Sequence, residues 1–183
     1  MKKITLIALL FAFSWQTHAQ NFEDPNVKRN ELKLDPLWLI FGSAINIHYD
    51  YFLSEWSSLG VYGLVYIGSK EDYTLKAQLL ACYRLYFGKN PMQGFFFEGN
   101  FGLTSWREEV WRHNRYDEHF GLGIGIALGW KWYIPKSGVV LDIYGGSGRL
   151  FGSDSWNFYP RVGIAIGKRF GSTSRKITDV PSL

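Results

Sequence analysis

Residues 120–134 (FGLGIGIALGWKWYI) alternate large apolar side chains with small or polar ones. The odd positions are glycine or alanine, except for Lys131 and Tyr133. A period of two indicates a β-strand whose two faces meet different environments, whereas 3.6 residues per helical turn would mix large and small residues on every face. The stretch is longer than most strands, which run to about 10 residues, and its length suits a strand that crosses a bilayer at a tilt.

Seven further segments repeat this alternation, at residues 31–40, 44–53, 58–68, 75–87, 94–104, 139–147 and 158–170. Pro36 is awkward within the first of them, because proline lacks the N–H that a sheet ladder needs and requires an edge or irregular position. Eight strands satisfy the even number found in bacterial single-chain barrels. The sequence therefore predicts an all-β fold, an eight-stranded antiparallel up-and-down transmembrane β-barrel over residues 31–170.

The charged residues support this register. The apolar parity of the predicted strands carries one charge, Lys168, close to a strand end. The opposite parity carries Glu31, Lys33, Asp35, Asp50, Lys76, Arg84, Glu98, Lys131, Asp142, Arg161 and Arg169. Because an Arg or Lys that faces lipid at the midplane costs about 2–4 kcal/mol, this segregation favours a membrane barrel with its charges inside.

The interior of an eight-stranded barrel is only wide enough for its own side chains. We therefore expect a plug of ion pairs across the glycine-rich wall of residues 120–134, with Arg84 and Glu98 as one pair because they lie on adjacent strands. The predicted network comprises Asp50, Lys76, Arg84, Glu98, Lys131, Asp142 and Arg161. A narrow conducting pore or proton path through the same charges is the alternative.

The lengths of the connections indicate an orientation. Residues 54–57, 88–93 and 135–138 are short and rich in turn formers, whereas 69–74, 105–119 and 148–157 are mostly longer. Outer-membrane barrels have short periplasmic turns and longer external loops. The periplasmic rim then carries an aromatic girdle on its lipid side, formed by Tyr49, Tyr51, Phe87, Phe95, Trp130 and Trp132.

Residues 1–19 have the pattern of a secretory signal peptide. Lys2 and Lys3 precede an apolar run, and a small-x-small cleavage pattern ends at Ala19. A periplasmic lead, residues 20–30, precedes the barrel, and a periplasmic tail, residues 171–183, follows it. The expected location is the bacterial outer membrane, with outer-membrane lipids, lipopolysaccharide and the barrel-assembly machinery as partners.

The composition narrows the possible functions. Aromatic residues make up 18% of the 183 residues and there are 20 glycines, while the mean hydropathy of −0.11 fits a chain in which only alternate residues face lipid. The net charge of +4 comes from basic residues that alternate with acids, so no nucleic-acid partner is expected. Cys82 is the single cysteine, which excludes an internal disulfide and a cysteine-cluster metal site. We expect no cofactor.

The predicted external loop 105–119 mixes aromatic residues with arginines. Its candidate binding residues are Trp106, Arg107, Trp111, Arg112, Arg115 and Tyr116. Exposed aromatic residues and arginines are enriched in binding hot spots, and arginine suits the phosphates of lipopolysaccharide. A solvated loop with rim-anchoring tryptophans is the simpler interpretation. A weaker hypothesis is a metal site formed by His113, Asp117 and His119.

The chain resembles the small eight-stranded outer-membrane barrel proteins of Bacteroidetes that form a domain family of unknown function. The resemblance is carried by residues 30–36 (NELKLDP), 83–87 (YRLYF), 94–99 (GFFFEG) and 167–170 (GKRF), and it covers about residues 29 to 170. More loosely, the chain is similar to OmpX-like and OmpA-like barrels. The resemblance implies a fold and a location but no reaction.

The leading hypothesis is a non-enzymatic outer-membrane barrel, structural or presenting external loops for surface interaction. One alternative is a lipid A-modifying enzyme, for which Ser105 or Ser147 would be the nucleophile on the lipid face near the outer rim; neither has a histidine nearby on the same face. Another is a soluble lipocalin-like barrel, in which the apolar parity would face inward around a ligand.

Overall fold

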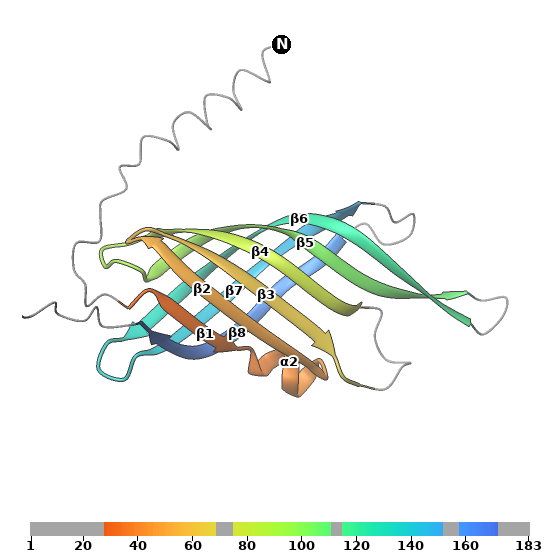
Figure 1. Ribbon diagram of the computed structural model, residues 1–183, viewed down its shortest axis with the longest axis horizontal. Coiled ribbons are helices and arrows are strands. Elements are labelled where there is room, and N and C mark those ends of the chain that lie inside the picture. Colours follow the sequence, from red (N-terminus) through yellow and green to blue (C-terminus); the bar gives the residue numbers. More distant parts are fainter. Residues whose placement is uncertain (1–27, 69–74, 111–114, 152–157, 172–183) are drawn as a thin grey trace, which may run out of the picture.

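The computed structural model describes residues 28–68, 75–110, 115–151 and 158–171, without the side chains of residues 108–110 and 115–118. These residues form a closed antiparallel barrel in which each strand pairs with its neighbours in the sequence (Figure 1). The strands are β1 (Asn30–Leu34), β2 (Ala44–Ser54), β3 (Ser57–Tyr66), β4 (Leu75–Phe87), β5 (Gly94–Val110), β6 (Arg115–Ile134), β7 (Val139–Phe151) and β8 (Phe158–Phe170). The predicted eight-stranded up-and-down barrel is confirmed.

The bounds of β4 and β8 match the prediction, but the predicted loop 105–119 is wrong for most of its length. Strands β5 and β6 continue as a paired ribbon to Val110 and Arg115, and in Figure 1 this ribbon reaches beyond the other strands. The register sets Arg107 opposite Glu118 and Val110 opposite Arg115. The strands were predicted from alternating apolar residues, but backbone hydrogen bonds between strands form without an apolar face. The polar sequence of the ribbon therefore did not predict it.

The predicted first strand, residues 31–40, is wrong beyond Leu34. The chain turns there into a short helix, α2 (Pro36–Phe41), which is capped by Asp35. One carboxylate oxygen of Asp35 accepts a hydrogen bond from the backbone amide of Leu37 at 3.0 Å. Aspartate is a favoured N-cap, and proline suits the first helical position because its missing N–H has no helical partner there. The Asp35–Pro36 pair is therefore a helix start.

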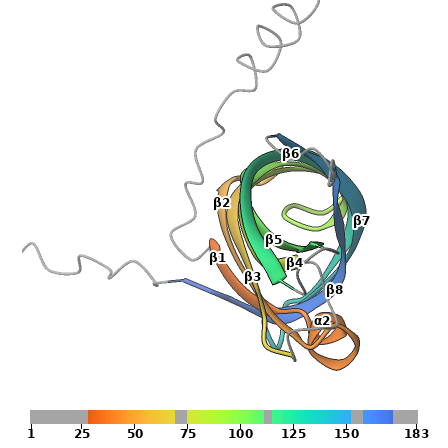
Figure 2. The same cartoon turned by 90° about the vertical axis from the view of Figure 1, so that its right-hand side faces the viewer.

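Helix α2 completes the barrel wall where β1 ends. Strand β1 pairs with residues 47–51 of β2 and 166–170 of β8, and within the described residues the earlier part of β8 pairs only with β7. Helix α2 lies beside β2 and β8 on the outside of the barrel (Figure 2). The indole N–H of Trp38 donates to the carbonyl of Val162 at 2.8 Å, which satisfies one backbone group of the unpaired β8 edge.

Asp35 joins this helix to the interior. The Tyr144 hydroxyl on β7 donates to the second carboxylate oxygen of Asp35 at 2.7 Å, and the Asn46 amide on β2 donates to it at 3.5 Å. Gly163 on β8 makes the arrangement possible, because a Cβ at that position would overlap the Asp35 carboxylate and the Tyr144 hydroxyl. Asp35 thus connects four elements at the place where the first strand is interrupted.

Asp35→Ala is expected to destabilise the barrel by about 2–5 kcal/mol. Losing an N-cap costs about 0.5–2 kcal/mol, and losing the hydrogen bond from the Tyr144 hydroxyl to a charged carboxylate costs about 1.5–3 kcal/mol more, while Nε2 of His48 remains 3.2 Å from that hydroxyl. Asp35→Asn keeps a cap and an acceptor, so it should retain most of the stability. The check is the temperature at which the folded electrophoretic band is lost. Equal midpoints for wild type and Asp35→Ala would contradict this role.

The two faces of the wall have opposite character. Ile126 is 58% exposed on the outside, whereas Lys131, of the other parity, is 1% exposed on the inside. This orientation contradicts the lipocalin-like alternative, which required apolar side chains inside and charges outside. One apolar residue was misplaced: Leu75 is buried in the interior, because a bulge between Leu75 and Ala77 changes the parity of β4. The structure contains no helix, in the part it describes, with the length and apolar character to cross a membrane.

Candidate functional site

The interior of the barrel holds a balanced set of buried charges. Among the described residues, five acidic and five basic side chains are buried. The acids are Glu31, Asp35, Asp50, Glu98 and Asp142, and the bases are Lys33, Arg84, Lys131, Arg161 and Arg169. A buried charge is tolerated when it is paired and hydrogen-bonded, so the equal numbers are the composition that a dry interior requires.

Glu98 on β5 lies at one centre of this network. Its Oε2 accepts from Nε of Arg84 at 2.8 Å, which is the pair expected from the strand order. Its Oε1 accepts from Nε of Arg161 at 2.8 Å, across the barrel from β8. Arg84 also donates through Nη1 to Asp142 at 2.8 Å and to Asp50 at 3.1 Å. Three carboxylates and two guanidinium groups thereby join β2, β4, β5, β7 and β8.

The lysines complete the network nearer to β1. Lys33 pairs with Asp50 and, at 2.6 Å, with Asp142. Lys131 on β6 pairs with Glu31, which also accepts from Nε of Arg169 at 2.8 Å. Sequence reasoning placed Lys33, Glu31 and Arg169 inside but omitted them from the network.

Lys76 differs from the other predicted members of the network. It is half-buried beside the β4 bulge, near the start of that strand, and not among the buried charges of the interior. The bulge breaks the parity on which the prediction for Lys76 rested.

Apolar side chains close the interior on both sides of the charges. We call the end with the β2–β3, β4–β5 and β6–β7 turns the turn end and the opposite end the loop end. The cluster towards the turn end is Phe52, Tyr86, Met92, Phe96, Tyr144 and Ala165. The cluster towards the loop end is Ala44, Tyr62, Leu64, Leu75, Leu80, Cys82, Trp106, Leu150 and Tyr159. The charges therefore lie between two apolar layers.

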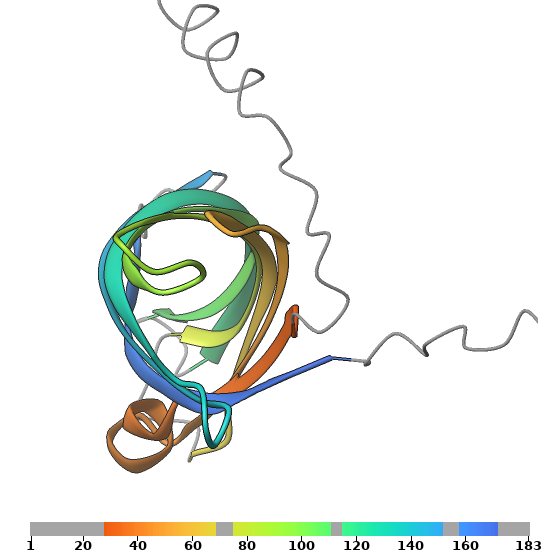
Figure 3. The same ribbon diagram turned by 90° about the vertical axis from the view of Figure 1, so that its left-hand side faces the viewer.

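The turn between β4 and β5 adds a cap at the turn end. It lies across the barrel mouth in Figure 3, and its Met92 is 4% exposed. The backbone carbonyl of Met92 accepts a hydrogen bond from Nη2 of Arg169 at 2.7 Å. The same guanidinium lies 4.8 Å from the ring centroid of Phe52. Cation–π contact and the hydrogen bond hold the turn over the charged layer.

The glycines of β6 give room to rings rather than to ion pairs, which corrects the prediction. A Cβ at Gly121 would lie 2.9 Å from the Trp106 ring, and one at Gly123 would lie 2.5 Å from the Tyr159 ring. The charged side chains come chiefly from the other strands, and Lys131 is the β6 residue that joins them. A large aromatic ring that packs against the wall fills more space there than an extended lysine or arginine side chain does. The rings are therefore the groups that require glycine at the facing wall positions.

The predicted external binding surface is not assembled as expected. Trp106 was predicted to be exposed, but it is 1% exposed in the loop-end cluster, stacked on His119 with ring centroids 5.9 Å apart. Arg107 is half-buried. Arg115 and Tyr116 belong to β6, although their side chains lie outside the description. Trp111, Arg112 and the suggested metal ligand His113 lie outside the described residues.

All six residues of the predicted girdle are outward-facing and exposed at the turn end: Tyr49, Tyr51, Phe87, Phe95, Trp130 and Trp132. Two ring pairs are in contact, Phe87 with Phe95 at 6.1 Å and Trp130 with Trp132 at 6.2 Å between centroids. The loop end has a second set of exposed rings that sequence reasoning did not recognise, Phe41, Phe120, Phe151 and Phe158. Phe41 and Phe151 were missed because they fell outside the predicted strands.

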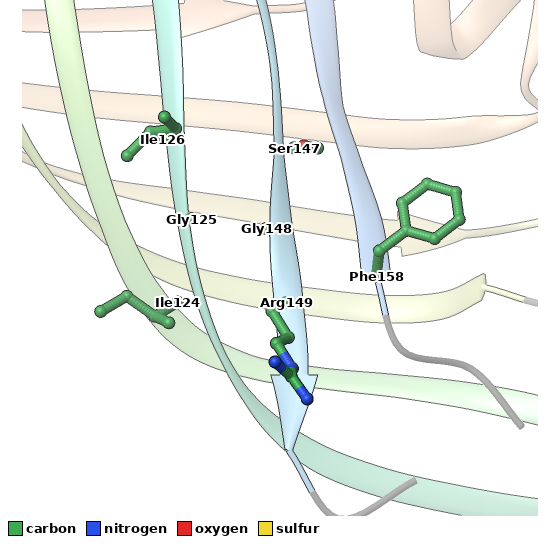
Figure 4. Close-up of a pocket in the computed structure, with 7 residues that line it drawn as sticks. All are labelled: Ile124, Gly125, Ile126, Ser147, Gly148, Arg149 and Phe158. Carbon is green, nitrogen blue, oxygen red and sulfur yellow. The ribbon is translucent and has the colours of Figure 1, made fainter. Parts of the chain in front are cut away.

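A groove of about 480 Å³ lies on the outer wall near the loop end (Figure 4). Ser147, Gly148 and Arg149 on β7 form its floor, between Ile124 and Ile126 on β6 and Phe158 on β8. Arg149 was missed because the predicted strand stopped at residue 147, whereas β7 continues to Phe151.

The groove bears on the enzyme hypothesis. Among the described residues, neither histidine nor carboxylate lines it beside Ser147. The other candidate nucleophile, Ser105, has the outward parity that was predicted, opposite the exposed Phe120, but it is only 6% exposed in the extended part of β5. The described residues contain no cluster of three or more His, Cys, Asp or Glu side chains that could hold a metal ion.

Comparison with solved structures finds the N-terminal β-barrel domain of Pseudomonas aeruginosa OprF, with a TM-score of 0.46 and 13% sequence identity. The superposition covers 78% of this chain and 98% of that domain. No family model and no curated protein matches the chain, so its resemblance to the Bacteroidetes barrel family stays a prediction from the motifs. The assignment as a closed eight-stranded antiparallel barrel rests on the strand pairing of the chain itself.

Proposed function

We propose that the protein is a non-enzymatic outer-membrane β-barrel with a filled interior. The observation that carries the proposal is the outer surface, an apolar belt bounded by aromatic side chains at both ends. The belt includes Leu32, Ile47, Leu59, Val61, Leu79, Phe97, Phe101, Leu122, Ile124, Ile126, Leu128, Ile143 and Val162, each more than a third exposed. Soluble monomers rarely expose contiguous apolar patches beyond a few hundred Å², whereas an apolar belt between aromatic girdles is what a bilayer-spanning barrel presents.

The interior supports a structural role rather than conduction. Its buried charges balance, each of the five acids contacts at least one hydrogen-bond donor, and two apolar layers cover them. An ion path would need water-accessible polar groups continuous from end to end. Charges that satisfy one another between apolar layers favour a plug.

The two ends of the barrel support an orientation with the turn end in the periplasm. Short turns belong on that side of outer-membrane barrels, and longer structures extend outside. The ribbon of β5 and β6 reaches beyond the barrel at the loop end (Figure 1). We propose that this ribbon is the part that a surface partner or lipopolysaccharide would meet, and that residues 1–19, outside the description, direct export.

Fractionation of expressing cells followed by electrophoresis of unboiled and boiled membranes tests the proposal. We expect the protein in the outer-membrane fraction, as a band that changes mobility on boiling because the closed ladder resists detergent until it is heated. Lys131→Met, which removes a paired interior charge, serves as a variant whose folded band should be lost at lower temperature. A soluble periplasmic or secreted product would contradict a membrane barrel.

A further inference from the structure

A cation faces outward near the loop end, and the described residues offer it no partner. Arg149 is exposed on β7, and no hydrogen bond or ion pair joins it to another described residue. The register sets it between Ile124 on β6 and Phe158 on β8, so the wall itself offers no carboxylate. Next to Arg149 are two exposed rings, Phe151 and Phe158. Arg149 therefore lies at the height of the loop-end aromatic residues, where a bilayer changes from hydrocarbon to headgroups.

On the turn-end side of Arg149 the outer wall is hollow. The outward positions of β7 continue from Arg149 through Ser147 to Gly145, and a Cβ at Gly145 would meet nothing within 4 Å. Larger side chains flank this row, with Ile126 and Leu128 on β6 and Val162 on β8. Four residues of strand measure about 13 Å. The groove is thus mostly apolar along its length and cationic at its loop end, as Figure 4 shows for the part between Ile126 and Arg149.

We propose that this groove binds one molecule of the phosphorylated lipid of the outer leaflet, lipid A, with an acyl chain along Ser147 and Gly145 and a phosphate on Arg149. Arginine matches phosphate with two parallel hydrogen bonds. The inference rests on the proposed function, because only a membrane-spanning barrel with its loop end outside brings Arg149 to this leaflet. Lipid A is the occupant that combines saturated chains, phosphate and that leaflet.

Native mass spectrometry of the purified, folded barrel with added lipid A tests the proposal. A hydrogen bond to a charged group contributes about 1.5–3 kcal/mol, so Arg149→Gln should lower retention about tenfold or more. Ser147→Leu, which fills the groove, should lower it as well. Two matched controls should retain lipid A like the wild type: Lys168→Gln, which removes an outward cation near the other end, and Gly63→Leu, which fills open outward space on β3.

Each variant is first shown to give a folded, heat-modifiable band in the outer membrane. If the wild type fails that step, the proposed function itself fails. If the wild type folds there but retains no lipid A, or if Arg149→Gln retains as much as wild type, the groove proposal fails alone. Equal retention of lipid A stripped of its phosphates would also overturn it, as would preferential retention of phosphatidylglycerol, which would identify a glycerophospholipid site.

Asp154 supplies a further control, because this acid follows Arg149 closely in the sequence and lies outside the described residues. With a lipid phosphate as the partner of Arg149, Asp154→Asn should leave retention unchanged. A marked rise in retention would show that Asp154 holds Arg149 in the native chain, and the proposal would then be wrong.

Discussion

Glu98→Ala is expected to lower strongly the urea concentration at which the folded barrel unfolds. The variant leaves Arg84 and Arg161 with no carboxylate between them, and both guanidinium groups are about 1% exposed. Removing one partner of a buried ion pair costs about 3–5 kcal/mol, and Glu98 has two such partners. The free energy of unfolding of a native protein is only about 5–15 kcal/mol, so such a loss removes a large part of it. The measurement is urea-induced unfolding of the refolded barrel in detergent.

A matched set of variants separates charge from packing. Glu98→Gln keeps the shape but not the charge, so it should be destabilised less than Glu98→Ala. Adding Arg161→Gln to Glu98→Gln restores the charge balance and should recover part of the loss. Glu55→Ala, at the half-buried β2–β3 turn, is the control and should unfold like the wild type. If Glu98→Ala unfolds at the same urea concentration as Glu55→Ala, the ion-pair network does not stabilise the fold.

Ile126→Arg should block membrane assembly, whereas Phe151→Arg should be tolerated. Ile126 lies on β6 between Trp130 at the turn end and Phe120 at the loop end, so it faces the middle of the apolar belt. An arginine that faces lipid at the midplane costs about 2–4 kcal/mol, and near the interface about 0–1 kcal/mol. Phe151 lies in the loop-end aromatic set, where the smaller value applies.

The assay compares the fraction of each variant that folds into lipid vesicles, judged by the unboiled band. Ile126→Leu is the control for size at the same position. If Ile126→Arg and Phe151→Arg fold equally well, outward Ile126 does not contact hydrocarbon, and the proposal of a membrane barrel would lose its main support.

Sequence reasoning identified the interior residues well because the side-chain period of a strand is two, so one correct register assigns a whole strand. Asp50, Arg84, Glu98, Lys131 and Asp142 were all placed inside on this basis, as the structure has them. The same rule failed where the period is interrupted. The bulge at the start of β4 moved Leu75 inward, and the helix start at Asp35 and Pro36 was treated as alternation.

The partners within the network were less predictable. Arg84 and Glu98 are on neighbouring strands, so the register alone brings them together. Arg161 reaches the same carboxylate across the barrel, and that contact depends on the stagger and diameter of the closed sheet. Arg149 was missed for a simpler reason. The sequence pattern around a single arginine near a strand end does not distinguish an outward strand residue from a loop residue.

The short first strand also determines where the barrel opens most easily. Strand β1 joins the two ends of the sheet over five residues, whereas β5 and β6 have 17 and 20. Pairing the strands of a local β-hairpin closes a short loop, which costs little conformational entropy. Pairing β1 with β8 closes a loop of nearly the whole chain, which costs more, and it forms ladder hydrogen bonds over only five residues. We therefore expect the barrel to close last at this seam and transient opening to begin there, so that the backbone amides of β1 are the first to exchange with solvent.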